Sequence, residues 1–164
     1  MKKQCLQDKV IVITGATGGL GRAAAQALRE KGAKLALLDM DLDVVNKMAA
    51  ELGDSTVVEG GSVDVCSLST IEAAMAEAAQ HFGGLDVVVA GAGVSSVVAL
   101  EHIDMDNFAR VIDINLNGVA RTFRAALPYI KERQGYLLAI SSMAAFVHSP
   151  LNAAYTASKA GVLA

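Results

Sequence analysis

A tyrosine and a lysine near the end of the sequence have the spacing of a proton-transfer pair. Tyr155 and Lys159 lie four residues apart in a segment typical of a helix, so their side chains share one face. A free phenol has a pKa of about 10 and is a poor base near neutral pH, but a close ammonium group stabilises the phenolate. The pair is therefore a candidate for acid–base chemistry, and an ordinary amphipathic helix face is the alternative explanation.

Two polar residues upstream are candidates for the same chemistry. Ser142 follows the apolar residues 136–140, where its hydroxyl can hydrogen-bond a substrate oxygen that gains or loses a proton. Ser141 is its rival, and either hydroxyl can instead cap the end of a strand. Asn115 lies in a helical region, where asparagine is mildly unfavourable, so a buried Asn115 needs a polar partner or a water. An exposed helix position fits Asn117 better.

A glycine-rich turn follows the first apolar segment of the chain. Between Thr14 and Gly21 the glycines have the spacing G-x-x-x-G-x-G, and an alanine-rich helical segment comes next. Without Cβ atoms in the way, a diphosphate can reach the N-terminus of the helix, where free N–H groups and the helix dipole favour negative charge. The turn therefore predicts a dinucleotide site, with a plain structural turn as the alternative. The residues of the turn expected to bind the cofactor are Gly15, Thr17, Gly19, Leu20 and Gly21.

An aspartate at the end of the second apolar segment strengthens the dinucleotide prediction. Asp39 comes 18 residues after Gly21, close to the ~20-residue offset at which a carboxylate binds an adenosine ribose. Such a carboxylate accepts hydrogen bonds from the ribose hydroxyls and repels a 2′-phosphate. The turn itself contains no Lys or Arg, and Arg22 is expected to face solvent. NAD is therefore favoured over NADP, and Asp41 is better placed than Asp39 to cap the next helix.

Short apolar segments alternate with longer helical segments along the chain. The apolar ones are typical of strands buried on both faces of a parallel sheet. They cover residues 10–14, 35–39, 57–63, 85–90 and 136–140. The helical segments cover residues 19–31, 42–52, 69–82 and 104–133, with a last helix from near Asn152. This alternation predicts an α/β fold with right-handed crossovers, and Ser69 with Glu72 predicts a capping box at the third helix.

Composition favours a globular enzyme or binding domain and excludes several other classes. The 164 residues are 53% hydrophobic and 19% charged, which suits a single domain over residues 1–164 and is too apolar for disorder. A net charge of −3 and the absence of Trp disfavour a nucleic-acid-binding surface. No segment has the ~20 apolar residues of a membrane span or the core of a signal peptide. Because Cys5 and Cys66 cannot make a disulfide framework, we expect a reduced, cytoplasmic protein without metal ligands.

In this order and spacing, the glycine turn, Asp39, Asn115, Ser142 and the Tyr155–Lys159 pair resemble the short-chain dehydrogenase/reductase family. The resemblance covers residues 10–164. It implies a Rossmann-like, doubly wound sheet with strand order 3-2-1-4-5. It also implies hydride transfer between NAD and a small alcohol or ketone, and a homo-oligomer in the full-length form.

The resemblance implies a role for each candidate residue. Tyr155 is the general acid–base group, and Lys159 stabilises its phenolate and binds the nicotinamide ribose. Ser142 orients the substrate oxygen, and Asn115 holds a water of the proton relay. The other residues expected to bind the cofactor are Asp64, Val65, Ala90 and Gly91.

The chain departs from the family pattern at two places. Residues 90–93 are Ala-Gly-Ala-Gly, where the family usually has Asn-Asn-Ala-Gly, so the side-chain hydrogen bonds of the first Asn are lost. Members of the family also continue past the Tyr–Lys helix with a sixth strand, a substrate lid and a seventh strand. We therefore interpret the chain as truncated, with an apolar sheet edge exposed at residues 136–140. We expect it to be unstable or domain-swapped, and a weak catalyst at best.

Three other functions stay open at this point. One is an NADP-dependent carbonyl reductase, and another is an inactive dinucleotide-binding fragment or scaffold. The presence of Asn115, Ser142, Tyr155 and Lys159 together argues against long-standing loss of catalysis in the parent protein. A lyase or epimerase is disfavoured because the spacing G-x-x-G-x-x-G is more usual there. The apolar residues 143–151 suggest a hydrophobic alcohol or ketone as substrate.

Overall fold

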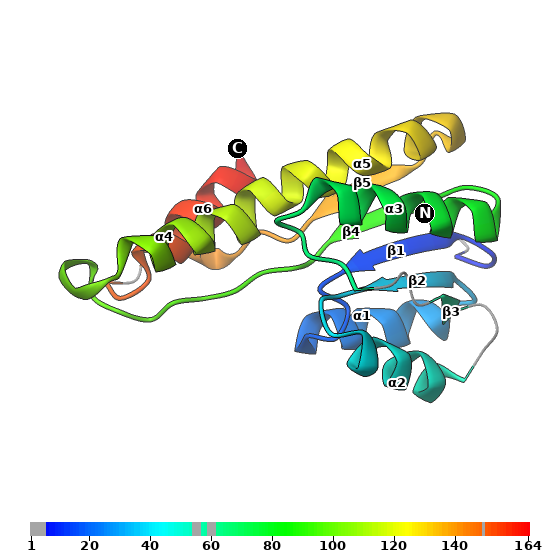
Figure 1. The fold of residues 1–164 in the computed structure, drawn as a ribbon, viewed down its shortest axis with the longest axis horizontal. Helices are drawn as coiled ribbons and strands as arrows, with labels where there is room; N and C mark the ends of the chain where they lie inside the picture. Colours follow the sequence, from blue (N-terminus) through cyan, green and yellow to red (C-terminus); the bar gives the residue numbers. More distant parts are fainter. Residues whose placement is uncertain (1–5, 54–56, 59–61, 149) are drawn as a thin grey trace.

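Five parallel strands form one sheet in the computed structural model, which describes residues 6–53, 57–58, 62–148 and 150–164 (Figure 1). The strands are β1 (Val10–Thr14), β2 (Lys34–Leu38), β3 (Val57–Val58), β4 (Val87–Ala90) and β5 (Tyr136–Ala139). Their order is β3-β2-β1-β4-β5, and each neighbouring pair is parallel. The predicted α/β fold class with strand order 3-2-1-4-5 is therefore confirmed.

The third strand is shorter than the predicted segment 57–63. Regular pairing with β2 covers Val57 and Val58, and an isolated bridge joins Asp39 to Ser62. Residues 59–61 and Cys5 lie outside the described residues. The bridge keeps the chain beside the end of β2 just before it reaches Val63, which lines the cleft described below.

Helices cover both faces of the sheet, so the fold is doubly wound (Figure 1). The α-helices are α1 (Gly19–Arg29), α2 (Leu42–Leu52), α3 (Leu68–Phe82), α4 (Met105–Ile112), α5 (Gly118–Arg133) and α6 (Ala153–Leu163). Short 3₁₀ turns are η1 (Leu100–His102) and η3 (Met143–Ala145), and η2 (Asp113–Asn117) is a π-helical turn. The predicted helical region 104–133 is thus interrupted by a wider turn that its sequence did not reveal.

Alternate side chains of β1 enter two separate apolar cores, as expected for a central strand. Val10 and Val12 pack in the core that contains residues of α3 and α5. Ile11 and Ile13 pack in the core that contains residues of α1 and α2. All five residues of β1 are buried, so the glycine turn that follows the strand starts from a rigid base.

The predicted capping box at Ser69 is wrong. Helix α3 begins at Leu68 with Ser67 as its N-cap, and no side-chain capping hydrogen bond is made. The turn before the helix is held differently, because the Thr70 hydroxyl lies 3.0 Å from the carbonyl oxygens of both Asp64 and Ser67. By contrast, Asp41 accepts a hydrogen bond from the N–H of Val44 and caps α2 as predicted.

Helices α4 and α6 pack together beyond the carboxyl ends of β4 and β5 (Figure 1). In open α/β sheets, ligands bind at this edge. The two halves of the candidate site therefore come from β1–α1 on one side and from α4, η2 and α6 on the other.

Within the part of the chain that the structure describes, no helix combines the length and the apolarity needed to cross a bilayer.

Candidate active site

The glycines of the first turn have different structural roles. Gly15 has a φ of +69°, and a Cβ there would lie 2.6 Å from the Cα of Ala92. A Cβ on Gly21 would collide with the carbonyl oxygen of Gly15. A Cβ on Gly19, however, would meet no protein atom within 4 Å. Packing thus accounts for Gly15 and Gly21, whereas Gly19 leaves open space beside the start of α1.

That open space belongs to a cleft of about 440 Å³. Helix α1 begins there without a side-chain cap, and its first turn contains no acidic residue. Free N–H groups at the start of the helix can therefore receive an anion, and the bare backbone at Gly19 lets it approach. These features fit the diphosphate of a dinucleotide. The predicted residues that line the cleft are Gly15, Thr17, Gly19, Leu20, Gly21, Asp39, Asp64, Val65 and Gly91.

Ala90 was expected to bind the cofactor but, like Tyr155 and Lys159, does not line the cleft. It is 2% exposed within β4, and its carbonyl accepts a hydrogen bond from the N–H of Ile140. The chain borders the cleft only after the strand has ended, at Gly91, Ala92, Gly93 and Val94. Ala90 thus belongs to the sheet in this structure, and its role at the cofactor stays a prediction.

The carboxylate of Asp39 faces the glycine turn. Its Oδ2 accepts hydrogen bonds from the backbone N–H of Thr17 at 3.0 Å and from the Thr17 hydroxyl at 2.6 Å. Its Oδ1 accepts a hydrogen bond from the N–H of Met40 at 2.8 Å. Arg22 forms an ion pair with Glu51 at 2.8 Å and does not line the cleft. The carboxylate is thus held at the cleft, while the nearest arginine of α1 is bound elsewhere.

Lys159 is buried in α6 at the other side of the site. It is 5% exposed, and its Nζ donates to the carbonyl oxygen of Ile140 at 2.7 Å. The same Nζ lies 5.8 Å from the centre of the Tyr155 ring. Burial lowers the pKa of Lys159, because desolvation disfavours the charged form. The predicted Tyr–Lys pair therefore shares one helix face, with the amine in a largely dry environment.

Asn115 is completely buried in the π-helical turn η2. Its Oδ1 accepts from the N–H of Val94 at 2.8 Å, and its Nδ2 donates to the carbonyl of Val94 at 2.9 Å and to the Ser158 hydroxyl at 3.0 Å. Both N–H donors of the amide are therefore used within the protein. Asn117 is exposed, as expected.

The two candidate serines, Ser141 and Ser142, differ in the hydrogen bonds that they make. The hydroxyl of Ser141 donates to the backbone carbonyl of Lys159 at 2.8 Å, which ties the end of β5 to α6. The hydroxyl of Ser142 accepts from the N–H of Ala144 at 3.1 Å and begins the turn η3. Since the Ser142 hydroxyl donates to no residue in the part of the chain that the structure describes, it remains the stronger substrate-binding candidate.

Gly93 joins the two halves of the site. It lines the cleft, and a Cβ on Gly93 would lie 3.3 Å from Oδ1 of Asn115 and 3.6 Å from Nζ of Lys159. Lys159 and Asn115 do not line the cleft themselves, but they lie directly behind this glycine. The tertiary structure therefore brings Lys159 and Asn115 to the border of the predicted dinucleotide site.

The model of the short chain dehydrogenase family matches residues 9–164. The chain belongs to this family. Among curated relatives, an uncharacterized oxidoreductase of Staphylococcus epidermidis is 32% identical over 158 residues, which are 96% of this chain and 68% of the relative. Dehydrogenase/reductase SDR family member 7B of Mus musculus is 36% identical over 163 residues, and the match covers 96% of this chain and 50% of that protein.

A solved short-chain dehydrogenase-like structure has the same architecture. The alcohol dehydrogenase from the archaeon Thermococcus sibiricus, complexed with 5-hydroxy-NADP, superposes with a TM-score of 0.89 at 34% identity. The superposition covers 94% of this chain and 67% of the archaeal chain. The fold, the oxidoreductase family and a nicotinamide dinucleotide as the class of cofactor are therefore supported together.

Several residues of this candidate site in the short-chain dehydrogenase chain were missed by the sequence analysis, among them Arg110, Ile114 and Ser158. Arg110 and Ile114 line the cleft, and Ser158 binds the amide of Asn115. Their spacing of four residues would have placed Arg110 and Ile114 on one helix face. The sequence does not show that this face covers the cleft, because that depends on how α4 and η2 pack against the rest of the chain.

Proposed function

We propose that this chain is an oxidoreductase that interconverts a secondary alcohol and a carbonyl compound by hydride transfer with NAD. The observation that carries the proposal is the position of Gly93, which borders the cleft. A Cβ on this glycine would lie 3.3 Å from Oδ1 of Asn115 and 3.6 Å from Nζ of Lys159, so both side chains lie just behind the cleft wall. This arrangement offers a proton-transfer pair beside a diphosphate-binding turn. Both are needed for a reaction that moves a hydride and a proton together.

The N-terminus of α1 and the backbone at Gly19 would hold the diphosphate, and Asp39 would accept hydrogen bonds from the adenosine ribose. The carboxylate of Asp39 disfavours a 2′-phosphate, and the Arg22–Glu51 ion pair keeps that cation from compensating. These two features support NAD. An NADP-dependent carbonyl reductase is the second candidate, since the archaeal alcohol dehydrogenase of the same fold was solved with 5-hydroxy-NADP.

When bound, the nicotinamide would take a hydride from the carbinol carbon, or return one to the carbonyl carbon. Ser142 would hydrogen-bond the substrate oxygen, and Tyr155 would remove the hydroxyl proton as the carbon–oxygen double bond forms. The ammonium of Lys159 would stabilise the phenolate, because burial makes a charge interaction stronger than it is in water. In reduction, Tyr155 would donate the proton to the same oxygen.

Asn115 would act mainly by holding its surroundings in place. Its amide binds the backbone of Val94 at both the N–H and the carbonyl, and it also binds Ser158. A water of the proton relay would therefore have to use the backbone carbonyl of Asn115 or the remaining lone pair of Oδ1. The amide N–H groups are already occupied.

The exposed side chains next to Ser142 suggest a hydrophobic alcohol or ketone. Met143, Phe146, Val147 and Leu151 are between 45% and 71% exposed, although they are large and apolar. Large apolar side chains that stay exposed can mark a binding surface. They also follow directly on the residue that would bind the substrate oxygen.

The experiment is an NAD⁺ titration by calorimetry followed by a turnover assay with secondary alcohols, on wild type and Tyr155→Phe. The variant is expected to keep its NAD⁺ affinity within about twofold and to lose about 10²-fold or more in turnover, the usual contribution of a general acid–base group. Tyr136→Phe, at an exposed tyrosine on β5, is the control and should change neither. Equal turnover in Tyr155→Phe would contradict the catalytic role, and NAD⁺ binding without any turnover in wild type would favour a dinucleotide-binding scaffold.

A further inference from the structure

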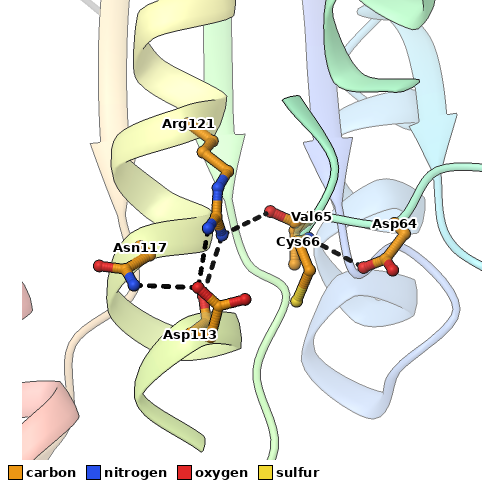
Figure 2. Close-up of polar contacts among 6 residues, drawn as sticks. All are labelled: Asp64, Val65, Cys66, Asp113, Asn117 and Arg121. Carbon is orange, nitrogen blue, oxygen red and sulfur yellow. Dashed lines mark hydrogen bonds and ion pairs between the residues drawn. The ribbon is translucent and has the colours of Figure 1, made fainter. Parts of the chain in front are cut away.

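A charged cluster joins α5 to the wall of the cleft (Figure 2). Arg121 donates from Nη2 to Oδ1 of Asp113 at 2.8 Å, and Asn117 donates to the same oxygen at 2.9 Å. The other terminal nitrogen of Arg121, Nη1, lies 3.4 Å from the backbone carbonyl oxygens of both Asp113 and Val65. One guanidinium therefore contacts two segments that are far apart in the sequence.

On one side of this cluster lies the turn that carries Asn115. Asp113 is the first residue of η2, and its carbonyl accepts the N–H of Gly118, five residues later. This hydrogen bond spans five residues instead of the four of a regular α-helix, and such π-helical turns are frequent at functional sites. Because Arg121 binds both the carboxylate and the carbonyl of Asp113, it holds the start of the wide turn in one geometry.

On the other side lies the cleft. Val65 is 7% exposed and lines the cleft, and its carbonyl receives the hydrogen bond from Arg121. Its side chain packs against the helix backbone, since a Cβ on Gly118 would lie 3.0 Å from Cγ2 of Val65. Val65 is therefore held against the helix at its carbonyl and at its side chain.

The cluster has no reactive group of its own. Arg121 and Asn117 lower the pKa of Asp113 to about 2, so the carboxylate stays charged over the neutral range. Burial, together with Asp113 and Asp64, raises the pKa of the Cys66 thiol to about 12. The neutral thiol is a poor nucleophile. Positioning, rather than chemistry, is the task that the contacts of Arg121 can perform.

We propose that Arg121 is a positioning residue that couples the cleft wall at Val65 to the helical turn of Asn115. The inference rests on the proposed function, because it takes the cleft to be a dinucleotide site with Val65 at the cofactor. Arg121 keeps the wall in the position that binds the cofactor, and the same guanidinium sets the geometry of η2. Cofactor binding and the placement of Asn115 thereby depend on one side chain that touches neither cofactor nor substrate.

The test is NAD⁺ titration by calorimetry at a temperature where every variant is folded. Arg121→Met is expected to raise the Kd for NAD⁺ by on the order of tenfold, because Val65 loses the donor that holds its carbonyl. Arg124→Met removes the same charge from an exposed position on the same helix and is expected to leave the Kd within about twofold. Arg121→Lys is expected to recover part of the loss, since an ammonium reaches Asp113 but lacks the planar fork that binds several acceptors.

Gly118→Ala tests the same contact while the ion pair stays intact. The added Cβ would press on Val65, so the Kd for NAD⁺ is expected to rise several-fold although alanine favours the helix. This variant decides the matter if Arg121→Met fails to fold. An unchanged Kd in the folded Arg121 variant, with only a lower melting temperature, would overturn the proposal. A wild-type chain that binds no NAD⁺ would instead overturn the proposed function, and this inference with it.

Discussion

Hydrogen bonds within the protein hold the Asp39 carboxylate in one position. Both carboxylate oxygens accept hydrogen bonds, from Thr17 in the glycine turn and from the N–H of Met40. These bonds hold the carboxylate at the end of β2 and link it to the turn that would bind the diphosphate. A group fixed in this way would lose little conformational entropy if a ribose bound to it.

At the scale of this residue, we predict that Asp39→Ser changes the choice of cofactor. NAD⁺ affinity should fall by about tenfold, because the charge-assisted bonds to the ribose are lost, while NADP⁺ affinity should fall less or rise. Asp41→Ser is the matched control, since serine also caps a helix and Asp41 does not line the cleft. Titrations of both cofactors against each variant measure the ratio, and an unchanged ratio would contradict the role of Asp39.

At the scale of elements, a buried hydrogen-bond chain connects α6 to η2 and to the segment after β4. Ser158 accepts from Nδ2 of Asn115 at 3.0 Å and donates to the backbone carbonyl of Tyr155 at 2.7 Å. Asn115 in turn binds the backbone of Val94. The position of α6, and with it the Tyr–Lys pair, therefore depends on polar contacts rather than on apolar packing alone.

We predict opposite outcomes for two substitutions on α6. Ser158→Ala leaves a donor of Asn115 buried without its acceptor and should lower the free energy of unfolding by about 1–3 kcal/mol. Thr156→Val should be neutral or slightly stabilising, because the Thr156 hydroxyl is buried and has no hydrogen-bond partner among the described residues. Urea unfolding of both variants measures the difference. Equal effects of the two substitutions would mean that the hydrogen-bond chain contributes little.

At the scale of the whole molecule, a second ionic cluster lies at the opposite end of the sheet. Asp86 is 7% exposed and accepts hydrogen bonds from Nζ of Lys9 at 2.8 Å and from the N–H of Val10 at 3.0 Å. Arg133 of α5 lies 3.7 Å from the same carboxylate. Desolvation alone would raise the pKa of Asp86, but these partners outweigh it and lower the pKa. The cluster connects β1, β4 and α5.

Stability should therefore decline in acid. A lowered pKa in the folded state means that the unfolded chain binds protons first as the pH falls. The contribution of Asp113 is therefore present above about pH 5 and is lost as the pH falls towards its folded-state pKa of about 2. The contribution of Asp86 is lost in the same direction, because its pKa is also lowered. Asp86→Asn should lower stability at pH 7 and flatten this decline, whereas Glu77→Gln on the exposed face of α3 should not. Urea unfolding between pH 7 and pH 3 measures both slopes. A decline in Asp86→Asn as steep as in wild type would count against this account.

The open edge of the sheet predicts self-association of the 164-residue chain. Among the described residues β5 pairs with β4 alone, and Tyr136 and Leu138 are 63% and 36% exposed, which confirms the expected apolar edge. Unpaired apolar edges recruit other strands, and a lysine on the edge opposes this. Tyr136→Lys should therefore reduce association in sedimentation experiments, while Val44→Lys on exposed α2 should not. A wild-type chain that stays monomeric at all concentrations would refute the prediction.

The sequence by itself determined the fold class and, through the family resemblance, the strand order of the sheet. Apolar periodicity and glycine spacing are local properties of the sequence, so they can be interpreted without knowing how the helices and strands pack. The placement of Asp41 as a cap and the absence of Arg22 from the cleft were predictable for the same reason. The capping box at Ser69 failed because α3 begins at Leu68 with Ser67 as its N-cap, so Ser69 already lies inside the first turn of the helix.

Only the tertiary structure decided which residues meet. Gly93 lies against both Asn115 and Lys159, and Arg121 reaches the carbonyl of Val65. None of these pairs has a spacing that a helix or strand would repeat, because each joins elements that are distant in sequence. Their contacts follow from how η2 and α6 pack beyond the ends of β4 and β5. Helix packing depends on the fit of whole surfaces, which a single sequence does not display.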